Sequence, residues 1–145
     1  SQPLHAFDLD RLEEKRIEVR RAIRGERLET IDGTKHDLNP EVLIIADGQR
    51  PVAIAGVMGG RDTEVGEDTR NILLESAKFK PSTVRRAARR LAMATDSSYR
   101  FERGVDIEGV DWASKRACKL IQEIAGGEVS NGVVDLYPNK FQEKL

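Results

Sequence analysis

Two Asp-Gly pairs, each set between two segments that could form strands, constrain the fold of this 145-residue chain more than any other feature. An Asp-Gly pair tolerates the positive φ angles that a two-residue hairpin turn requires, so it is a strong signal for a β-hairpin. The pairs are Asp32-Gly33, between residues 27–31 and 34–38, and Asp47-Gly48, between residues 42–46 and 51–55. The sequence therefore predicts two successive hairpins. The second should be central in a sheet, because its strands are apolar on both faces.

Two further segments have strand patterns. Residues 17–23 alternate apolar with charged side chains, which is the period of a half-buried strand. Residues 71–77 place three apolar residues directly before Glu75, a position where a solvated carboxylate is less expected. The more common explanation for a strand-end glutamate is pairing with an arginine. Residues 5–10 are too short to assign to an element.

The second half of the chain has the period of helices. Residues 82–94 follow Pro81, which suits a first turn, and place apolar and basic residues on opposite sides of a helix. Residues 108–125 predict a second amphipathic helix that ends at Gly126-Gly127, and residues 128–137 alternate weakly, as in a last strand. We therefore expect an α+β fold. It should have a mixed, largely antiparallel sheet with hairpins in the first half and two longer amphipathic helices in the second half.

Four arginines form the polar side of the first predicted helix. At 100° per residue they lie within one arc, opposite Val84, Ala87 and Leu91. Like charges four residues apart cost about 0.2–0.5 kcal/mol per pair, so we expect anionic partners, either acids of this protein or phosphates of another molecule. The choice of arginine supports anionic partners, since its planar guanidinium group suits bidentate contacts to carboxylates and to phosphates. The alternative is that these charges only face solvent. The four residues are Arg85, Arg86, Arg89 and Arg90.

The length of the chain predicts a single domain spanning residues 1–145. Cys118 is the single cysteine and cannot form an internal disulfide, and no apolar run approaches the roughly 20 residues that span a bilayer. These features fit a cytoplasmic protein best. Because Gln2-Pro3 is typical of the middle of a connection, we expect a fragment excised from a longer protein.

Several classes of site lack the residues that they need. The two histidines, His5 and His36, are far apart, and one cysteine cannot build a zinc site, so no metal site is expected. We expect His36 at the surface. The sequence contains no nucleophile-elbow pattern and no phosphate-binding glycine pattern. The glycines of residues 56–60 could serve loop conformation or the close approach of a ligand, and the first interpretation is favoured.

Motifs along nearly the whole chain resemble one known family. In order and spacing they are similar to those of the B3/B4 module of the bacterial-type phenylalanyl-tRNA synthetase β subunit. The motifs are Gln2-Pro3-Leu4-His5-Ala6-Phe7-Asp8, Ala55-Gly56-Val57-Met58-Gly59-Gly60, Leu74-Glu75-Ser76-Ala77, and Arg89-Arg90 followed by Thr95-Asp96-Ser97-Ser98-Tyr99-Arg100-Phe101-Glu102-Arg103-Gly104-Val105-Asp106.

The resemblance implies an editing activity of this ligase, in which water hydrolyses the aminoacyl ester of tRNA(Phe) wrongly charged with tyrosine. Glu75 would accept a hydrogen bond from the tyrosine hydroxyl. Gly59 would form a close backbone wall of the pocket, and Thr95 and Ser97 would line it. His5 would lie near the scissile ester and orient or deprotonate water. The family often has alanine at the position of Ser97.

The resemblance also implies the partners of this segment. They are tRNA(Phe) charged with tyrosine, the synthetase α subunit and the remainder of the β subunit, with no DNA and no membrane. ATP and Mg²⁺ are expected only at the α-subunit site, so this segment should need no cofactor. The family's module begins upstream of Gln2, which predicts an N-terminally truncated fragment. The alternative function is a non-catalytic tRNA-docking or subunit-assembly module, which needs no pocket joining Glu75, Gly59 and Thr95.

Overall fold

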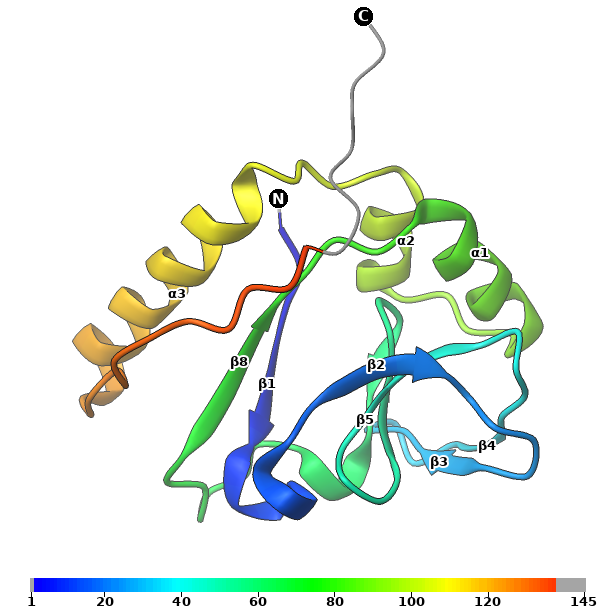
Figure 1. Ribbon diagram of the computed structural model, residues 1–145, viewed down its shortest axis with the longest axis horizontal. Helices are drawn as coiled ribbons and strands as arrows, with labels where there is room; N and C mark the ends of the chain where they lie inside the picture. The colour runs from blue at the N-terminus through cyan, green and yellow to red at the C-terminus, as the bar shows by residue number, and fades with distance from the viewer. Residues whose placement is uncertain (1, 138–145) are drawn as a thin grey trace, which may run out of the picture.

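A computed structural model describes residues 2–137 of the protein. Within them the chain forms three small antiparallel sheets and then three α-helices (Figure 1). The strands are β1 (Leu4–Asp8), β2 (Glu18–Arg21), β3 (Arg27–Glu29), β4 (Lys35–Asp37), β5 (Leu43–Ala46), β6 (Pro51–Ile54), β7 (Met58–Gly59) and β8 (Ile72–Ser76). The helices are α1 (Pro81–Arg90), α2 (Asp96–Glu102) and α3 (Gly109–Ala125), and short 3-10 helices occupy Leu9–Arg11, Glu13–Lys15 and Arg61–Thr63. The predicted α+β class is confirmed, with one helix more than expected.

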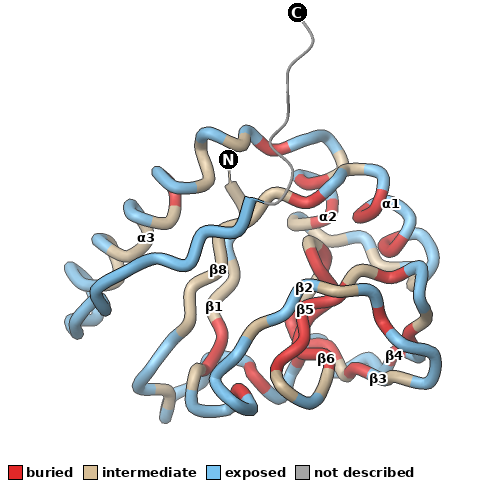
Figure 2. The backbone as a smooth tube through the Cα atoms, viewed as in Figure 1, coloured by how far each residue is buried: buried red, intermediate tan, exposed pale blue. Residues whose placement is uncertain are grey.

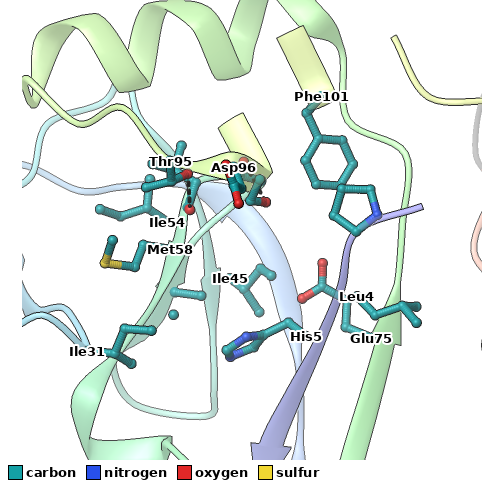
Figure 3. A pocket seen from close by; sticks show the side chains of 16 residues that line it. Leu4, His5, Ile31, Ile45, Ile54, Met58, Glu75, Thr95, Asp96 and Phe101 are labelled. Atoms are coloured by element: carbon teal, nitrogen blue, oxygen red, sulfur yellow. Dashed lines mark hydrogen bonds between the residues drawn. The ribbon is translucent and has the colours of Figure 1, made fainter. Parts of the chain in front are cut away.

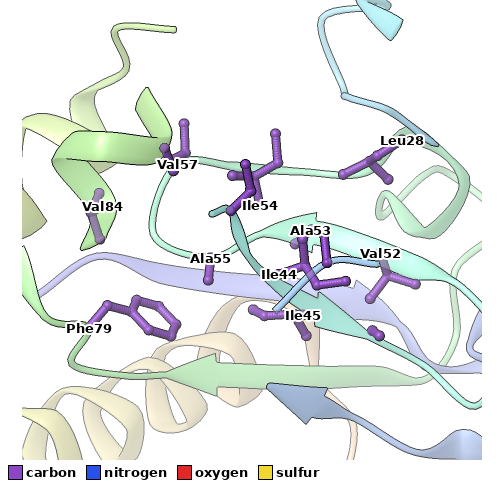
Figure 4. Packing of buried hydrophobic residues seen from close by; sticks show 14 of the residues in the cluster. Leu28, Ile44, Ile45, Val52, Ala53, Ile54, Ala55, Val57, Phe79 and Val84 are labelled. Atoms are coloured by element: carbon purple, nitrogen blue, oxygen red, sulfur yellow. The ribbon is translucent and has the colours of Figure 1, made fainter. Parts of the chain in front are cut away.

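The four-stranded sheet, in the order β2-β5-β6-β7, contains the centre of the core. The two inner strands are buried on both faces, as the sequence predicted for the second hairpin. Ile44 of β5 and Ile54 of β6 are fully buried, and they belong to one apolar cluster with Phe79 and Val84 (Figure 4). The cluster therefore joins the sheet to the first helix.

Both predicted hairpins form, but their turns are not the two-residue Asp-Gly turns that we expected. Gly33, at φ +81°, lies in a three-residue loop, in which its N–H donates to the Thr30 carbonyl and the Thr30 N–H donates to the Thr34 carbonyl. This is the loop that ends in a left-handed residue, for which glycine is favoured. In the second hairpin the turn lies one residue further along, because the Asp47 N–H pairs with the Arg50 carbonyl at 2.9 Å.

His36 is buried, so its expected position at the surface is wrong. It lies in β4 directly opposite Leu28 of β3, and only 9% of its surface is exposed. The reason is that the β3–β4 hairpin packs against the central sheet through contacts between β3 and β6. Its Nε2 atom has no hydrogen-bond partner among residues 2–137.

β1 and β8 form a separate antiparallel ribbon that joins opposite halves of the chain. The structure confirms the strand predicted at residues 71–77, whereas β1 was not assigned from the sequence. In this register His5 lies directly opposite Glu75, so both side chains project from the same face. The ribbon lies between α3 and the central sheet (Figure 1), and the Ser76 hydroxyl donates a 2.8 Å hydrogen bond to the Val110 carbonyl at the start of α3.

The first helix is shorter than the predicted range 82–94, because its backbone reverses at Ala92. Ala92 has φ +52°, its N–H bonds to the Arg89 carbonyl, and the Met93 N–H bonds to the Ala88 carbonyl at 2.8 Å. This pair of bonds is the Schellman motif, which usually has glycine at the left-handed position. Since the sequence has alanine there, the end of the helix was not recognised.

The third helix confirms the prediction for residues 108–125, and Gly126 ends it at φ +76°. Its apolar side is poorly covered, however, because only Ala113 is buried and Ile124 is 84% exposed. The strand predicted at residues 128–137 is wrong: this segment is irregular and exposed (Figure 2). None of the helices within residues 2–137 has the length and apolar composition needed to cross a bilayer.

Candidate active site

A pocket of about 270 Å³ opens where the β1–β8 ribbon, the turn before β7 and the start of α2 meet (Figure 3). The structure brings together in it all five residues predicted as catalytic or substrate-binding: His5, Gly59, Glu75, Thr95 and Ser97. The remaining lining residues are mostly apolar: Pro3, Leu4, Ile31, Ile45, Ala53, Ile54, Gly56, Val57, Met58, Asp96 and Phe101. The volume is near the lower end of the ~300–1,000 Å³ typical of ligand pockets, which suits a single amino-acid side chain.

Glu75 brings a carboxyl group without a protein partner into this pocket. The side chain comes from β8 and is directed toward the space between His5 and Phe101 (Figure 3). Within residues 2–137 the structure records no hydrogen bond or ion pair to this carboxyl, so the expected pairing with an arginine is wrong. Burial therefore acts without compensation, and it raises the pKa of Glu75 from 4.5 to about 7.

His5 stands beside Glu75 with an imidazole nitrogen that has no partner. Its Nε2 is buried and makes no hydrogen bond to residues 2–137, while the ring packs edge-on against Phe7 with the two centroids 4.4 Å apart. Burial lowers the pKa of His5, partly opposed by the negative charge of Glu64. The neutral imidazole is therefore favoured near pH 7, and it can hold or accept a proton at the pocket wall.

Gly59 lies against the His5 ring, and this contact explains why glycine is required there. A Cβ atom at position 59 would lie 2.3 Å from Cε1 and 2.6 Å from Nε2 of His5, closer than real Cβ atoms approach other atoms. Its φ is not in the left-handed region. A close approach therefore occurs at position 59, but the group that approaches is the protein's own imidazole, so the predicted approach of a ligand stays a prediction.

Thr95 and Ser97 fix the start of α2 to the turn before β7. The Thr95 hydroxyl donates to the Val57 carbonyl at 2.8 Å and accepts the Ser98 N–H at 3.0 Å, and the Ser98 hydroxyl completes a capping box by accepting the Thr95 N–H. The Ser97 hydroxyl donates to the Gly56 carbonyl at 3.1 Å. Both residues line the pocket, but both hydroxyls already have protein partners.

The four arginines of α1 all lie on its exposed side, as predicted. Two have acidic neighbours within the protein: Arg85 lies 3.7 Å from the Glu102 carboxylate and Arg90 lies 3.5 Å from that of Glu41. Arg86 and Arg89 have no ion pair with residues 2–137. Exposed pairs at such distances contribute little to stability, so this face stays available to an external anion.

Sequence reasoning placed the segment Thr95-Asp96-Ser97 at the pocket but did not assign Phe101 to it, although Phe101 lines it too. Phe101 belongs to α2, a seven-residue helix that was not predicted. The signal was present, since Thr95 followed three residues later by Ser98 gives the reciprocal cap observed here. No group of three or more His, Cys, Asp or Glu residues within the described range is placed to hold a metal ion.

Comparisons with known proteins show the family of this chain. The profile of the B3/4 domain matches residues 1–126. The phenylalanine–tRNA ligase beta subunit of Carboxydothermus hydrogenoformans is 49% identical over 144 residues, which are 99% of this chain and 18% of that protein. The protein of the same name from Moorella thermoacetica is 54% identical over 141 residues, 97% of this chain and 18% of its own length.

The chain thus spans less than a fifth of the length of these relatives. The family match covers the two strands, the glycine turn and the helix start that build the pocket. On the strength of that match, the chain belongs to the B3/4 domain family.

Proposed function

We propose that this domain edits aminoacyl-tRNA as part of a phenylalanine–tRNA ligase beta subunit, by hydrolysing the ester of tyrosine mistakenly attached to tRNA(Phe). One observation carries the proposal: an apolar pocket of side-chain size contains a half-buried carboxyl, Glu75, with no protein partner among residues 2–137. Such a group is costly to the fold, and a ligand that offers it a hydrogen bond removes that cost.

The chemistry of the pocket suits selection of tyrosine over phenylalanine. The two side chains differ by one hydroxyl, which a site built to accept phenylalanine excludes by only about a hundredfold. In the editing pocket the order is reversed, because the tyrosine hydroxyl donates to Glu75 whereas phenylalanine leaves the carboxyl unpaired, at a cost of roughly 1–3 kcal/mol. Apolar walls such as Ile45 and Phe101 accommodate the ring that both substrates share.

Hydrolysis proceeds by direct attack of water on the ester carbonyl. Attack forms the bond between the water oxygen and the carbonyl carbon, and collapse of the tetrahedral adduct breaks the ester bond to the terminal ribose oxygen, which leaves with a proton. His5, whose neutral imidazole lines the pocket, orients the water or accepts its proton. The Gly59 backbone holds the imidazole in place, and binding of the side chain positions the ester.

The wider partners follow from the same proposal. The substrate is tRNA(Phe) charged with tyrosine, and the domain acts in a cytoplasmic assembly with an α subunit and the rest of a β subunit. The exposed arginines of α1, above all Arg86 and Arg89, contact phosphates of the tRNA. ATP and Mg²⁺ would serve the α-subunit site rather than this pocket.

The test is a deacylation assay with the intact α and β subunits. Wild-type enzyme should release tyrosine from Tyr-tRNA(Phe) rapidly and spare Phe-tRNA(Phe), and Glu75→Ala should lose at least tenfold of kcat/KM for the tyrosyl substrate. Glu67→Ala, which removes an exposed carboxylate away from the pocket, is the matched control and should leave the rate unchanged. Equal tyrosine release by the Glu75→Ala variant and wild type would refute the role of Glu75.

The second candidate function is a non-catalytic tRNA-docking or subunit-assembly module, and the exposed arginine face favours it. It predicts salt-sensitive RNA binding with no hydrolysis of either charged tRNA. Charge reversal of Arg86 and Arg89 would then weaken RNA binding or subunit association, and if both stayed intact that function would be discarded.

A further inference from the structure

A second, more open groove lies beside the pocket on the outer side of the α1–α2 corner. It has a volume of about 580 Å³ and shares the lining residues Thr95 and Asp96 with the pocket, so the two hollows are neighbours at the start of α2. Its other lining residues come from α1, the Schellman turn and α2: Ala88, Arg89, Ala92, Met93, Ala94, Ser98, Tyr99, Glu102 and Arg103. Among these residues the proposed function gives a role to Arg89 alone, as a contact to tRNA phosphates.

Tyr99 and Arg103 form a flat platform in the groove. The Arg103 guanidinium carbon lies 3.4 Å from the centroid of the Tyr99 ring, and Arg103 Nη1 donates a 3.0 Å hydrogen bond to the Tyr99 carbonyl one turn earlier. Tyr99 is nevertheless 59% exposed. An exposed aromatic ring that is already stacked on one arginine is ordered before a ligand arrives, which lowers the entropy cost of binding.

Two arginines of the groove can contact an anion. Arg89 and Arg103 have no ion pair with residues 2–137, so their charges are not neutralised within the described part of the chain. Two acids also line the groove, Asp96 and Glu102, and Glu102 is engaged by Arg85 at 3.7 Å. Asp96 lies at the boundary with the pocket. The groove therefore combines an exposed aromatic face with two guanidinium groups that have no acidic partner among residues 2–137.

This combination is the chemistry that binds single-stranded nucleic acid, in which a base stacks on an aromatic side chain and arginine contacts the backbone. We propose that the groove holds the unpaired 3′-terminal nucleotides of the RNA whose aminoacyl ester occupies the pocket, with one base stacked on Tyr99. This inference rests on the proposed function, because it takes the ester-linked RNA as the ligand. Because Thr95 and Asp96 line both hollows, the platform lies one short step along the RNA from the ester.

The test separates RNA binding from hydrolysis. Binding of a fluorescein-labelled RNA tetranucleotide, ACCA, to the intact protein is measured by anisotropy for wild type, Tyr99→Ala and Tyr99→Phe. Loss of one stacked base predicts weakening by about 5- to 150-fold in Tyr99→Ala. Tyr99→Phe keeps the ring and should bind within about twofold of wild type. Because Tyr99 is exposed, thermal denaturation should show the same midpoint in all three proteins.

Arg89→Gln supplies an independent readout. Removal of one phosphate contact should make the plot of log RNA-binding constant against log salt concentration less steep by about 0.7. Equal affinity of Tyr99→Ala and wild type for the tetranucleotide, or no binding by wild type, overturns the groove proposal even if tyrosine is released normally from Tyr-tRNA(Phe). Conversely, weakened binding by Tyr99→Ala in a protein that hydrolyses no aminoacyl ester supports the groove and refutes the editing function.

Discussion

Replacing Glu75 with glutamine should stabilise the fold at neutral pH, although the residue is the centre of the proposed site. Burial raises the pKa of Glu75 from 4.5 in the unfolded chain to about 7 in the folded protein. At about 1.4 kcal/mol per pH unit, this rise corresponds to roughly 3–4 kcal/mol. That is a large share of the roughly 5–15 kcal/mol by which domains are typically stable.

The sign follows from proton binding. Between pH 4.5 and about 7 the folded state keeps the proton on Glu75 while the unfolded state has lost it, so the free energy of unfolding falls as the pH rises through this window. Above about pH 8 both states are ionised and the full penalty remains. Glutamine cannot ionise, so the Glu75→Gln variant lacks this loss.

The assay is urea denaturation of both proteins, followed by circular dichroism between pH 4.5 and 8. The difference in unfolding free energy, variant minus wild type, should rise by about 3 kcal/mol from the lowest to the highest pH. Glu67→Gln, which neutralises an exposed carboxylate, serves as the control and should show no such rise. Parallel pH profiles of the Glu75→Gln variant and wild type would refute the argument that this carboxyl is buried without a partner.

Three further results are expected. The preference for the tyrosyl over the phenylalanyl ester, measured as the ratio of the two kcat/KM values, should increase from pH 6 to 8. The reason is that Glu75 ionises over this range and becomes a stronger hydrogen-bond acceptor. A ratio that does not change with pH would contradict this. Gly59→Ala should lower the rate of deacylation at least about tenfold by displacing the His5 ring. Gly66→Ala is the control and should leave the rate unchanged, because a Cβ at that position meets nothing within 4 Å. Equal rates for Gly59→Ala and wild type would exclude this role of Gly59. Thr95→Val should lower stability by about 1–2 kcal/mol in thermal denaturation through loss of the helix cap, and Thr95→Ser should restore most of it; no loss would show that the cap is unimportant.

Local signals predicted the parts of this fold whose cause is local. The Asp-Gly pairs predicted both hairpins, and the glycine at position 126 predicted the end of α3. The left-handed residue that ends α1 is Ala92, and nothing in an alanine indicates that conformation. Such a site is set by tertiary packing, here by Met93, which packs against the core.

The elements that the sequence did not predict are those with distant partners or few turns. β1 is five residues long and pairs with β8 from the other half of the chain, so no periodicity within it could identify its partner. α2 has two turns, too few for an apolar stripe to be recognised. The strand pattern drew attention to Glu75, but its role, and those of His5 and Gly59, came from the resemblance to a family.

The separation of charge in this domain explains how the pocket can work. The sequence contains 24 lysine and arginine residues, yet none of those within residues 2–137 lines the pocket, and the four arginines of α1 lie on its exposed side. An arginine that reached Glu75 would lower the pKa of the carboxyl and occupy its acceptor sites, so a tyrosine hydroxyl would gain nothing by binding. Selectivity in the proposed reaction therefore requires that the fold tolerate the unpaired carboxyl. The Glu75→Gln variant should therefore gain stability and at the same time lose discrimination between tyrosine and phenylalanine.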